Sequence, residues 1–248
     1  MANWNDPQPT KTGFGAAPSL NGEVVGSAGT YDMGLRRHML SIYNYMSSGV
    51  LLSGIVALLF ASSGMAAQVI GTPLWWVIAL SPIGFVLAMS FGQNKFSTPA
   101  IQMMFWGFAI MMGLSLSTIF LRYTGASIAT TFFATAGAFA GLSLFGYTTK
   151  KNLTAMGSFM IMGVFGILIA MVINIFLQSS GLSMAISILG VLIFAGLTAY
   201  DTQRLKNQYY EVQGTEFAGK AIVLGALTLY LDFINMFQFL LSFLGNRE

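Results

Sequence analysis

The sequence predicts an all-α polytopic membrane protein, a bundle of seven transmembrane helices. Only 8% of its 248 residues are charged and 55% are hydrophobic, whereas soluble domains carry about 25% charged residues. Mean hydropathy is +0.72. Seven apolar runs follow one another along the chain, each near the roughly 20 residues that a spanning helix needs. These observations exclude an ordinary soluble domain.

The chain begins with a polar segment, residues 1–34, rich in Gly, Pro, Ser, Thr and Asn and without hydrophobic periodicity. This composition predicts a disordered tail. The segment lacks a basic stretch followed by an apolar one, so no cleavable signal peptide is expected. Residues 35–248 form the predicted transmembrane domain, and its first span covers about 40–62.

The second and third spans both begin at a proline. The second covers about 74–92 after Pro73, and the third covers about 99–121, with Thr98 as the expected cap and Pro99 at the first helical position. Proline is favoured there because the first turn of a helix leaves its N–H groups unpaired in any case.

The fourth span, about 126–148, carries Gly137 and Gly141. Two glycines four residues apart are a hint of close helix packing. The fifth span covers about 154–178 and follows a short connection.

The sixth span, about 182–202, is followed by the only long connection, 203–219, and by the seventh span, about 220–244. The short connections elsewhere leave no room for a soluble catalytic domain, so we expect no enzyme. The chain has no cysteine, which excludes disulfides and sulfur-based metal sites.

The basic residues are spread singly between the apolar runs, which is a topology signal and argues against nucleic-acid binding. With the N-terminus in the cytoplasm, nine basic residues fall on the cytoplasmic side and two, Arg122 and Arg247, on the other. Seven spans then place the C-terminus outside; a re-entrant last run would return it to the cytoplasm. The nine are Lys11, Arg36, Arg37, Lys95, Lys150, Lys151, Arg204, Lys206 and Lys220.

Two acids, Asp201 and Asp232, lie within or at the edge of the last two spans. An ionisable group in a membrane span costs about 2.5–3.5 kcal/mol on insertion scales, which makes it a functional candidate. Thr228 and Asn235 share the helix face of Asp232, and Thr198 shares that of Asp201. Two such polar stripes could form a seam inside the bundle.

Two carboxyls held close together in a low dielectric do not ionise independently, so the pair is expected to titrate as a unit. A shared proton would join the helices, and the doubly negative pair would repel or attract Ca²⁺, which prefers carboxylate oxygens. Asp201 and Asp232 are therefore candidate proton-sensing and Ca²⁺-binding residues. Lys95 and Arg204 are candidate counter-ions, and Arg204 is more simply an interface anchor.

The heights of the two acids conflict if the last helix starts at Lys220. Asp232 then lies about 18 Å along its helix, whereas Asp201 lies only about 7 Å from Lys206. The acids would miss one another by one or two turns, unless the last helix starts deeper in the cytoplasm or tilts.

Three segments resemble the Bax inhibitor (transmembrane BAX inhibitor motif) family over about residues 35–246. They are Gly-Leu-Thr-Ala-Tyr-Asp-Thr-Gln at 196–203, Leu-Tyr-Leu-Asp-Phe-Ile-Asn-Met-Phe at 229–237, and Ser-Phe-Gly-Gln-Asn-Lys at 90–95. The last of these is similar to the bacterial inner-membrane branch.

The resemblance implies a seven-helix bundle whose last helix is central, acting as a pH-sensitive Ca²⁺ leak channel. Its paired aspartates, here Asp201 and Asp232, would sense protons, and a basic residue near the second helix, here Lys95, would hold the sixth-helix acid. Bacterial relatives are also linked to a membrane-bound AAA protease as modulators or substrates. No cofactor is implied, and Ca²⁺ would be a permeant or bound ion.

Two other functions remain open on the sequence. An intramembrane aspartyl protease also has an acid on each of two consecutive helices, and Tyr200-Asp201 fits its first motif, but Leu229-Tyr230-Leu231 stands where Gly-x-Gly should precede the second acid. The other is an interaction protein that modulates a membrane protease or stress response. It would keep its function without both acids and lose it without residues 1–34.

Overall fold

The computed structural model describes residues 20–246, with side chains from Met33 onward. The chain divides into two compact units, Met1–Arg37 and His38–Glu248. The second unit holds the larger part of the first helix and all of the others. In order they are α1 (Leu20–Ser62), α2 (Met65–Val69), α3 (Pro73–Gly92), α4 (Thr98–Leu116), the short 3-10 helix η1 (Ser117–Leu121), α5 (Gly125–Thr148), α6 (Thr154–Leu177), α7 (Ser180–Val212) and α8 (Ala218–Leu244).

Within the described residues, seven helices are long and apolar enough to cross a membrane. They are α1 from Met33 onward, α3, α4 continued by η1, and α5 to α8. The predicted all-α polytopic fold is therefore confirmed. The predicted tail, 1–34, lies partly outside the described residues, and α1 begins inside it at Leu20.

Helix α7 differs most from the sequence-based expectation, because it continues to Val212, ten residues beyond the predicted end at 202. The extension is polar but contains neither glycine nor proline, and most of its residues are adequate helix formers. A short turn follows in which Gly214 adopts a positive φ of 75°, a conformation that suits glycine. The predicted long connection is thus mostly helix.

The prolines at the starts of α3 and α4 lie in the first helical turn, as expected, but the cap of α4 lies one residue earlier than predicted. Pro73 opens α3, but the cap of α4 is Ser97, whose side chain accepts a hydrogen bond from the Ala100 N–H. Thr98, the expected cap, is already the first helical residue, because α4 starts one residue earlier than predicted and Pro99 fits equally well inside the first turn.

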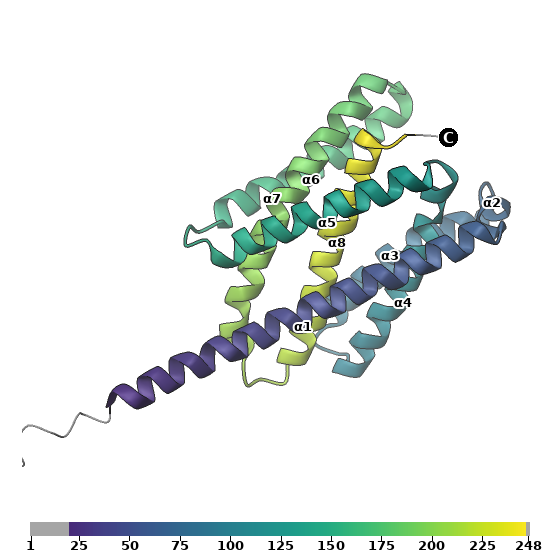
Figure 1. The fold of residues 1–248 in the computed structure, drawn as a ribbon. Coiled ribbons are helices and arrows are strands. Elements are labelled where there is room, and N and C mark those ends of the chain that lie inside the picture. The colour runs from purple at the N-terminus through teal and green to yellow at the C-terminus, as the bar shows by residue number, and fades with distance from the viewer. Residues whose placement is uncertain (1–19, 247–248) are drawn as a thin grey trace, which may run out of the picture. The chain divides into compact units, whose positions relative to one another are not determined.

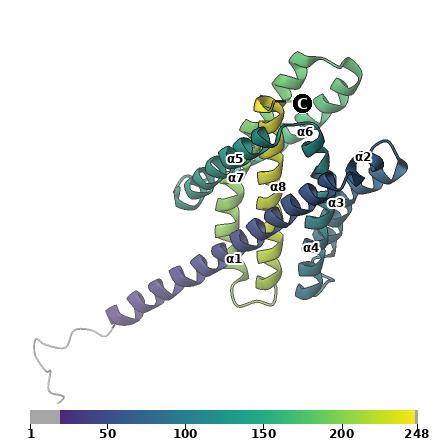
Figure 2. The ribbon, with the colours of Figure 1, turned by 45° about the vertical axis from the view of Figure 1, so that its right-hand side comes forward.

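Helix α8 is the most buried of the spanning helices. Its most apolar stretch is 61% buried, against 6% for that of α6. It packs against α3, α4, α5 and α7, and Figures 1 and 2 both show α7 and α8 side by side. The stronger expectation from the resemblance, a last helix surrounded by the other six, stays a prediction.

A buried hydroxyl cluster joins α8 to α1 and α4. The Ser53 Oγ lies 2.6 Å from the Tyr230 hydroxyl and donates to the Ala109 carbonyl at 2.6 Å. Tyr230 is fully buried, and its ring packs edge-on against Phe108, with centroids 4.9 Å apart. Buried polar groups need such partners, so this cluster fixes α8 against two neighbours.

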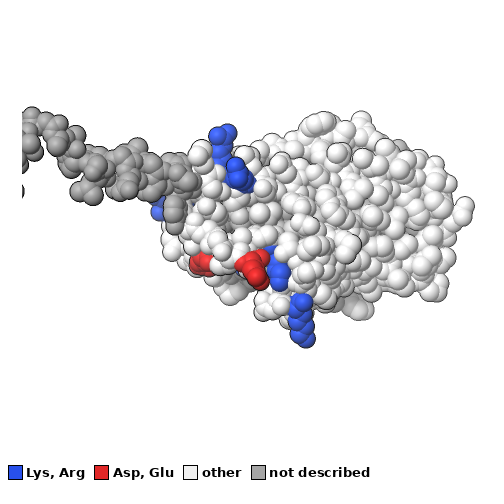
Figure 3. Space-filling view, turned by 90° about the horizontal axis from the view of Figure 1, so that it is seen from below, with Lys and Arg blue, Asp and Glu red and all other residues white. Residues whose placement is uncertain are grey.

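The charged residues gather away from the apolar flanks. Figure 3 looks at the molecule from below, the end that holds the α7–α8 turn, and shows basic and acidic side chains over one part of this face, with uncharged surface over the rest. The flanks expose large apolar side chains such as Phe91, Phe133 and Phe176, as expected of surfaces in contact with lipid.

Candidate functional site

The carboxyl groups of Asp201 on α7 and Asp232 on α8 are hydrogen-bonded to one another. Both residues are buried, with 7% and 4% of their surface exposed. An ionised carboxylate only accepts hydrogen bonds, so a bond between two carboxyls requires a proton on one of them. The two acids thus lie side by side across two neighbouring helices, in an arrangement that a single shared proton would stabilise.

The length of α7 brings the two acids to the same height. Asp201 lies about 17 Å along α7 from Val212, and Asp232 lies about 21 Å along α8 from Ala218, at 1.5 Å per residue. The two distances differ by less than one turn. The sequence-based comparison measured Asp201 from Lys206 and left the mismatch open. Because α7 continues past Lys206 to Val212, the difference in height shrinks to less than one turn.

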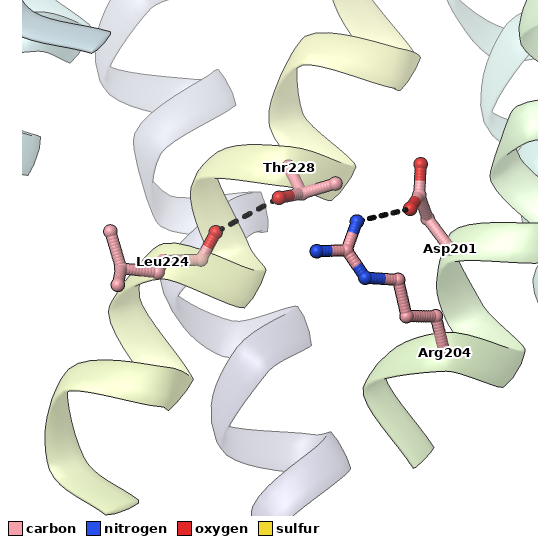
Figure 4. A network of polar contacts seen from close by, with 4 residues as sticks. All are labelled: Asp201, Arg204, Leu224 and Thr228. Carbon is pink, nitrogen blue, oxygen red and sulfur yellow. Dashed lines mark hydrogen bonds and ion pairs between the residues drawn. The ribbon is translucent and has the colours of Figure 1, made fainter. Parts of the chain in front are cut away.

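Arg204 supplies a positive charge to one side of the pair. Its Nη1 lies 3.6 Å from the Asp201 Oδ1, one turn along the same helix, and 62% of its side chain is exposed. Figure 4 shows the guanidinium between α7 and α8, on the side of Asp201 where Thr228 lies. Arg204 is thus both the ion-pair partner of Asp201 and a largely exposed surface residue.

One oxygen of the pair is unsatisfied. The Asp232 Oδ2 is buried and has no hydrogen-bond partner among the residues that the structure describes. A buried acceptor without a partner costs free energy, so this oxygen is the atom of the site that its surroundings satisfy least. No third Asp, Glu, His or Cys in the described chain completes a metal-binding cluster.

Three of the other predicted site residues form their hydrogen bonds inside their own helices. Thr198, Thr228 and Asn235 each donate to the carbonyl four residues earlier, a common arrangement for polar side chains inside helices. Lys95 is exposed at the α3–α4 connection, whereas Arg204 forms the ion pair with Asp201. The latch role of Lys95 stays a prediction.

A chain of hydroxyls reaches the residue next to Asp201 from two other helices. The Tyr43 hydroxyl on α1 donates to the Ser143 Oγ on α5 at 3.2 Å, and Ser143 is 2.9 Å from the Thr202 Oγ1 on α7. Sequence reasoning missed this chain. Each residue is an ordinary helical residue, and only the relative rotation of three helices brings them together.

Two further α7 side chains hold the connection between α5 and α6. The Gln203 side chain accepts from the Leu153 N–H at 2.9 Å and donates to the Lys151 carbonyl at 2.8 Å. The Lys206 Nζ donates to the Tyr147 carbonyl at 2.8 Å. The turn of α7 that carries Asp201 is thereby anchored on the side facing α5.

A cavity of about 980 Å³ lies at the end of the helices opposite the α7–α8 turn. Among its lining residues, those nearest the acids along each helix are Phe194 on α7 and Asn235 on α8. Asn235 is less than one turn from Asp232, at 1.5 Å per residue. The rings of Phe194 and Phe239 stack there, with centroids 5.8 Å apart. The two rings are thus part of the cavity lining, about two turns from the acids along their helices, and the cavity approaches Asp232 most closely at Asn235.

A smaller hollow of about 300 Å³ lies on the other side of the pair, along the end of α7. Arg204, the ion-pair partner of Asp201, is one of its lining residues. Polar side chains dominate the rest of the lining, which comprises Thr154, Tyr200, Gln203, Asn207, Gln208 and Glu211.

Comparisons with known proteins agree with this fold. The family described as inhibitor of apoptosis-promoting Bax1 matches residues 35–248. An uncharacterized protein of Caulobacter vibrioides is 48% identical over 88% of this chain and 92% of its own length. The inner membrane protein YbhL of Escherichia coli strain K12 is 42% identical over 87% of this chain and 94% of its own length. An uncharacterized protein of Rickettsia prowazekii, RP147, is 44% identical over 88% and 93% respectively.

Proposed function

The chain belongs to the Bax inhibitor family, and on that premise we propose that it is a pH-sensitive leak channel for Ca²⁺ and related cations. The Asp201–Asp232 pair would be its proton sensor. The observation that carries the proposal is the hydrogen bond between two buried carboxyls on neighbouring helices.

The protonated pair favours a closed channel. The shared proton leaves one negative charge, which Arg204 partly balances, and the carboxyl–carboxyl bond holds α7 against α8. Losing that proton places two negative charges side by side in a region of low dielectric, where they repel strongly. Separation of the helices relieves this repulsion, so flux rises with pH.

The hollows at the two ends support a path through the pair. The larger cavity approaches Asp232 from one end through Asn235, and the smaller hollow includes Arg204 at the other. The Phe194–Phe239 stack lines the larger cavity, and the two acids lie between that cavity and the smaller hollow. Narrow apolar constrictions and rings of charged groups are the elements from which channels build gates and filters.

Ca²⁺ is the cargo in this proposal and has no resident site. A stable Ca²⁺ site takes six to eight oxygen ligands, whereas this site offers two carboxyls and neighbouring hydroxyls. The ionised pair would attract the ion transiently, and the unpartnered Asp232 Oδ2 is the oxygen most available to it. Weak binding of this kind allows an ion to leave as well as to enter.

The name of the Escherichia coli relative supports a location in a bacterial inner membrane. The distribution of basic residues supports a cytoplasmic N-terminus and an external C-terminus. A second function, modulation of a membrane-bound AAA protease, rests on the family resemblance alone.

The test is Ca²⁺ entry into proteoliposomes that hold the purified protein, measured with an enclosed indicator from about pH 5 to about pH 8. The proposal predicts little entry at the acid end and a rise toward the alkaline end. Entry no faster than in protein-free liposomes at every pH would overturn it.

A further inference from the structure

Arg122 is the one charged residue among those that line the large cavity. It lies between η1 and the first turn of α5, and it is exposed. Four acids have side chains that the structure describes. Asp201 and Asp232 form the pair, while Glu211 and Glu216 lie near the α7–α8 turn at the other end. None of these four acids therefore stands beside Arg122.

A positive charge at this position is unfavourable for cation entry. The remaining polar lining is neutral, and much of it is already hydrogen-bonded within the protein: Asn174 donates to Ser183, and Ser187 donates to Ser242. Among the side chains that the structure describes, a cation entering from this end meets the guanidinium before it meets a carboxylate. Pores that conduct cations are commonly lined by acids at such points, whereas an arginine excludes them.

We propose that Arg122 acts as an electrostatic guard that limits cation access to the cavity and so keeps the leak slow. This inference rests on the proposed channel function and adds a specificity-determining residue remote from the acid pair. The guard acts on the ion's charge alone, so its effect depends on ion valence and on ionic strength.

The expected size follows from a screened Coulomb interaction. One positive charge about 6 Å from an ion's path, at about 0.1 M salt, lowers the local concentration of a monovalent cation roughly twofold. The energy scales with the charge of the ion, so the factor for Ca²⁺ is the square, roughly fourfold. Reversing the charge at this residue squares each factor again.

The experiment measures Ca²⁺ and K⁺ fluxes in proteoliposomes at about pH 8, the pH at which the proposed channel is open. The variants are Arg122→Gln, Arg122→Glu and Arg122→Lys. Lys150→Gln is the matched control, because Lys150 is also exposed and lies at the opposite end of α5. Each flux is measured at low and at high salt.

Arg122→Gln is expected to raise Ca²⁺ flux roughly fourfold and K⁺ flux roughly twofold, and Arg122→Glu to raise both further. The gains should shrink at high salt, and Arg122→Lys and Lys150→Gln should match the parent. Equal gains for both ions, a gain in Arg122→Lys as large as in Arg122→Gln, or no change would overturn the guard while leaving the channel in place. An absence of flux in the parent would overturn both.

Discussion

The Asp201 and Asp232 carboxyls face one another across the interface of the last two helices, and among the described residues Arg204 stands beside Asp201 alone. The two acids are therefore not equivalent. Negative charge is best accommodated at Asp201, next to Arg204, and the shared proton is best accommodated at Asp232. A substitution at Arg204 should therefore change the environment of Asp201 more than that of Asp232.

Replacing Arg204 by Gln is expected to move the rise in flux to higher pH. Without the guanidinium, ionisation of the pair is less favourable, so the proton is held longer as pH rises. The shift should be a fraction of a pH unit, because Arg204 is largely exposed and water screens its charge. Ca²⁺ flux measured against pH gives the midpoint, with Arg204→Lys as the charge-conserving control. A midpoint that stays in place would show that Arg204 does not act on the pair.

Replacing Phe239 by Ala is expected to raise Ca²⁺ flux at acid pH several-fold. The change removes half of the Phe194–Phe239 stack in the lining of the large cavity, and narrow apolar sections of this kind can restrict a conduction path. Phe176→Ala is the control, since Phe176 is 84% exposed and lies near the C-terminal end of α6. If both variants behave as the parent, the stack is packing and does not restrict the path.

Replacing Gly146 by Ala is expected to destabilise the protein by about 1–3 kcal/mol. An added methyl group at Gly146 would collide with the Ala199 backbone, where α5 crosses α7. At Gly137 the same methyl group meets open space, so Gly137→Ala should be neutral or stabilising by up to about 1 kcal/mol. Thermal unfolding in detergent compares the two variants, and equal melting temperatures would contradict the close approach.

The two glycines also show where sequence reasoning fails. The spacing of Gly137 and Gly141 predicted a packing face on the fourth span, but both lie where no neighbouring atom is within reach. That hint was wrong, and the close contact is made by Gly146 on the same helix. Spacing identifies residues that share a helix face, but it does not say whether that face meets protein or lipid.

The spans and the acid pair were predictable for a different reason. A membrane requires long apolar helices, and a buried acid stands out against them, so both leave a signal in one sequence. The extension of α7 past residue 202 was not predictable from hydropathy, because that segment is polar although helical. The Tyr43–Ser143–Thr202 chain depends on how three helices are rotated, which no local pattern encodes.

Removing residues 1–19 is expected to leave Ca²⁺ flux and its pH dependence unchanged, since every group assigned to the pathway lies in the unit from His38 onward. The measurement is the same flux assay on the shortened chain. Loss of flux on truncation would assign the segment to the pathway. Unchanged flux together with loss of a cellular phenotype would instead favour the interaction protein.

The central claim is that the Asp201–Asp232 pair senses protons, and its most direct test is the pH dependence of Ca²⁺ flux in Asp201→Asn and Asp232→Asn. Glu216→Gln is the matched control, because Glu216 is an exposed acid in the α7–α8 turn and lines neither the large cavity nor the smaller hollow. The account predicts that flux rises with pH in the parent and in Glu216→Gln, and is nearly independent of pH in both aspartate variants. A parent-like rise with pH in both aspartate variants would contradict it.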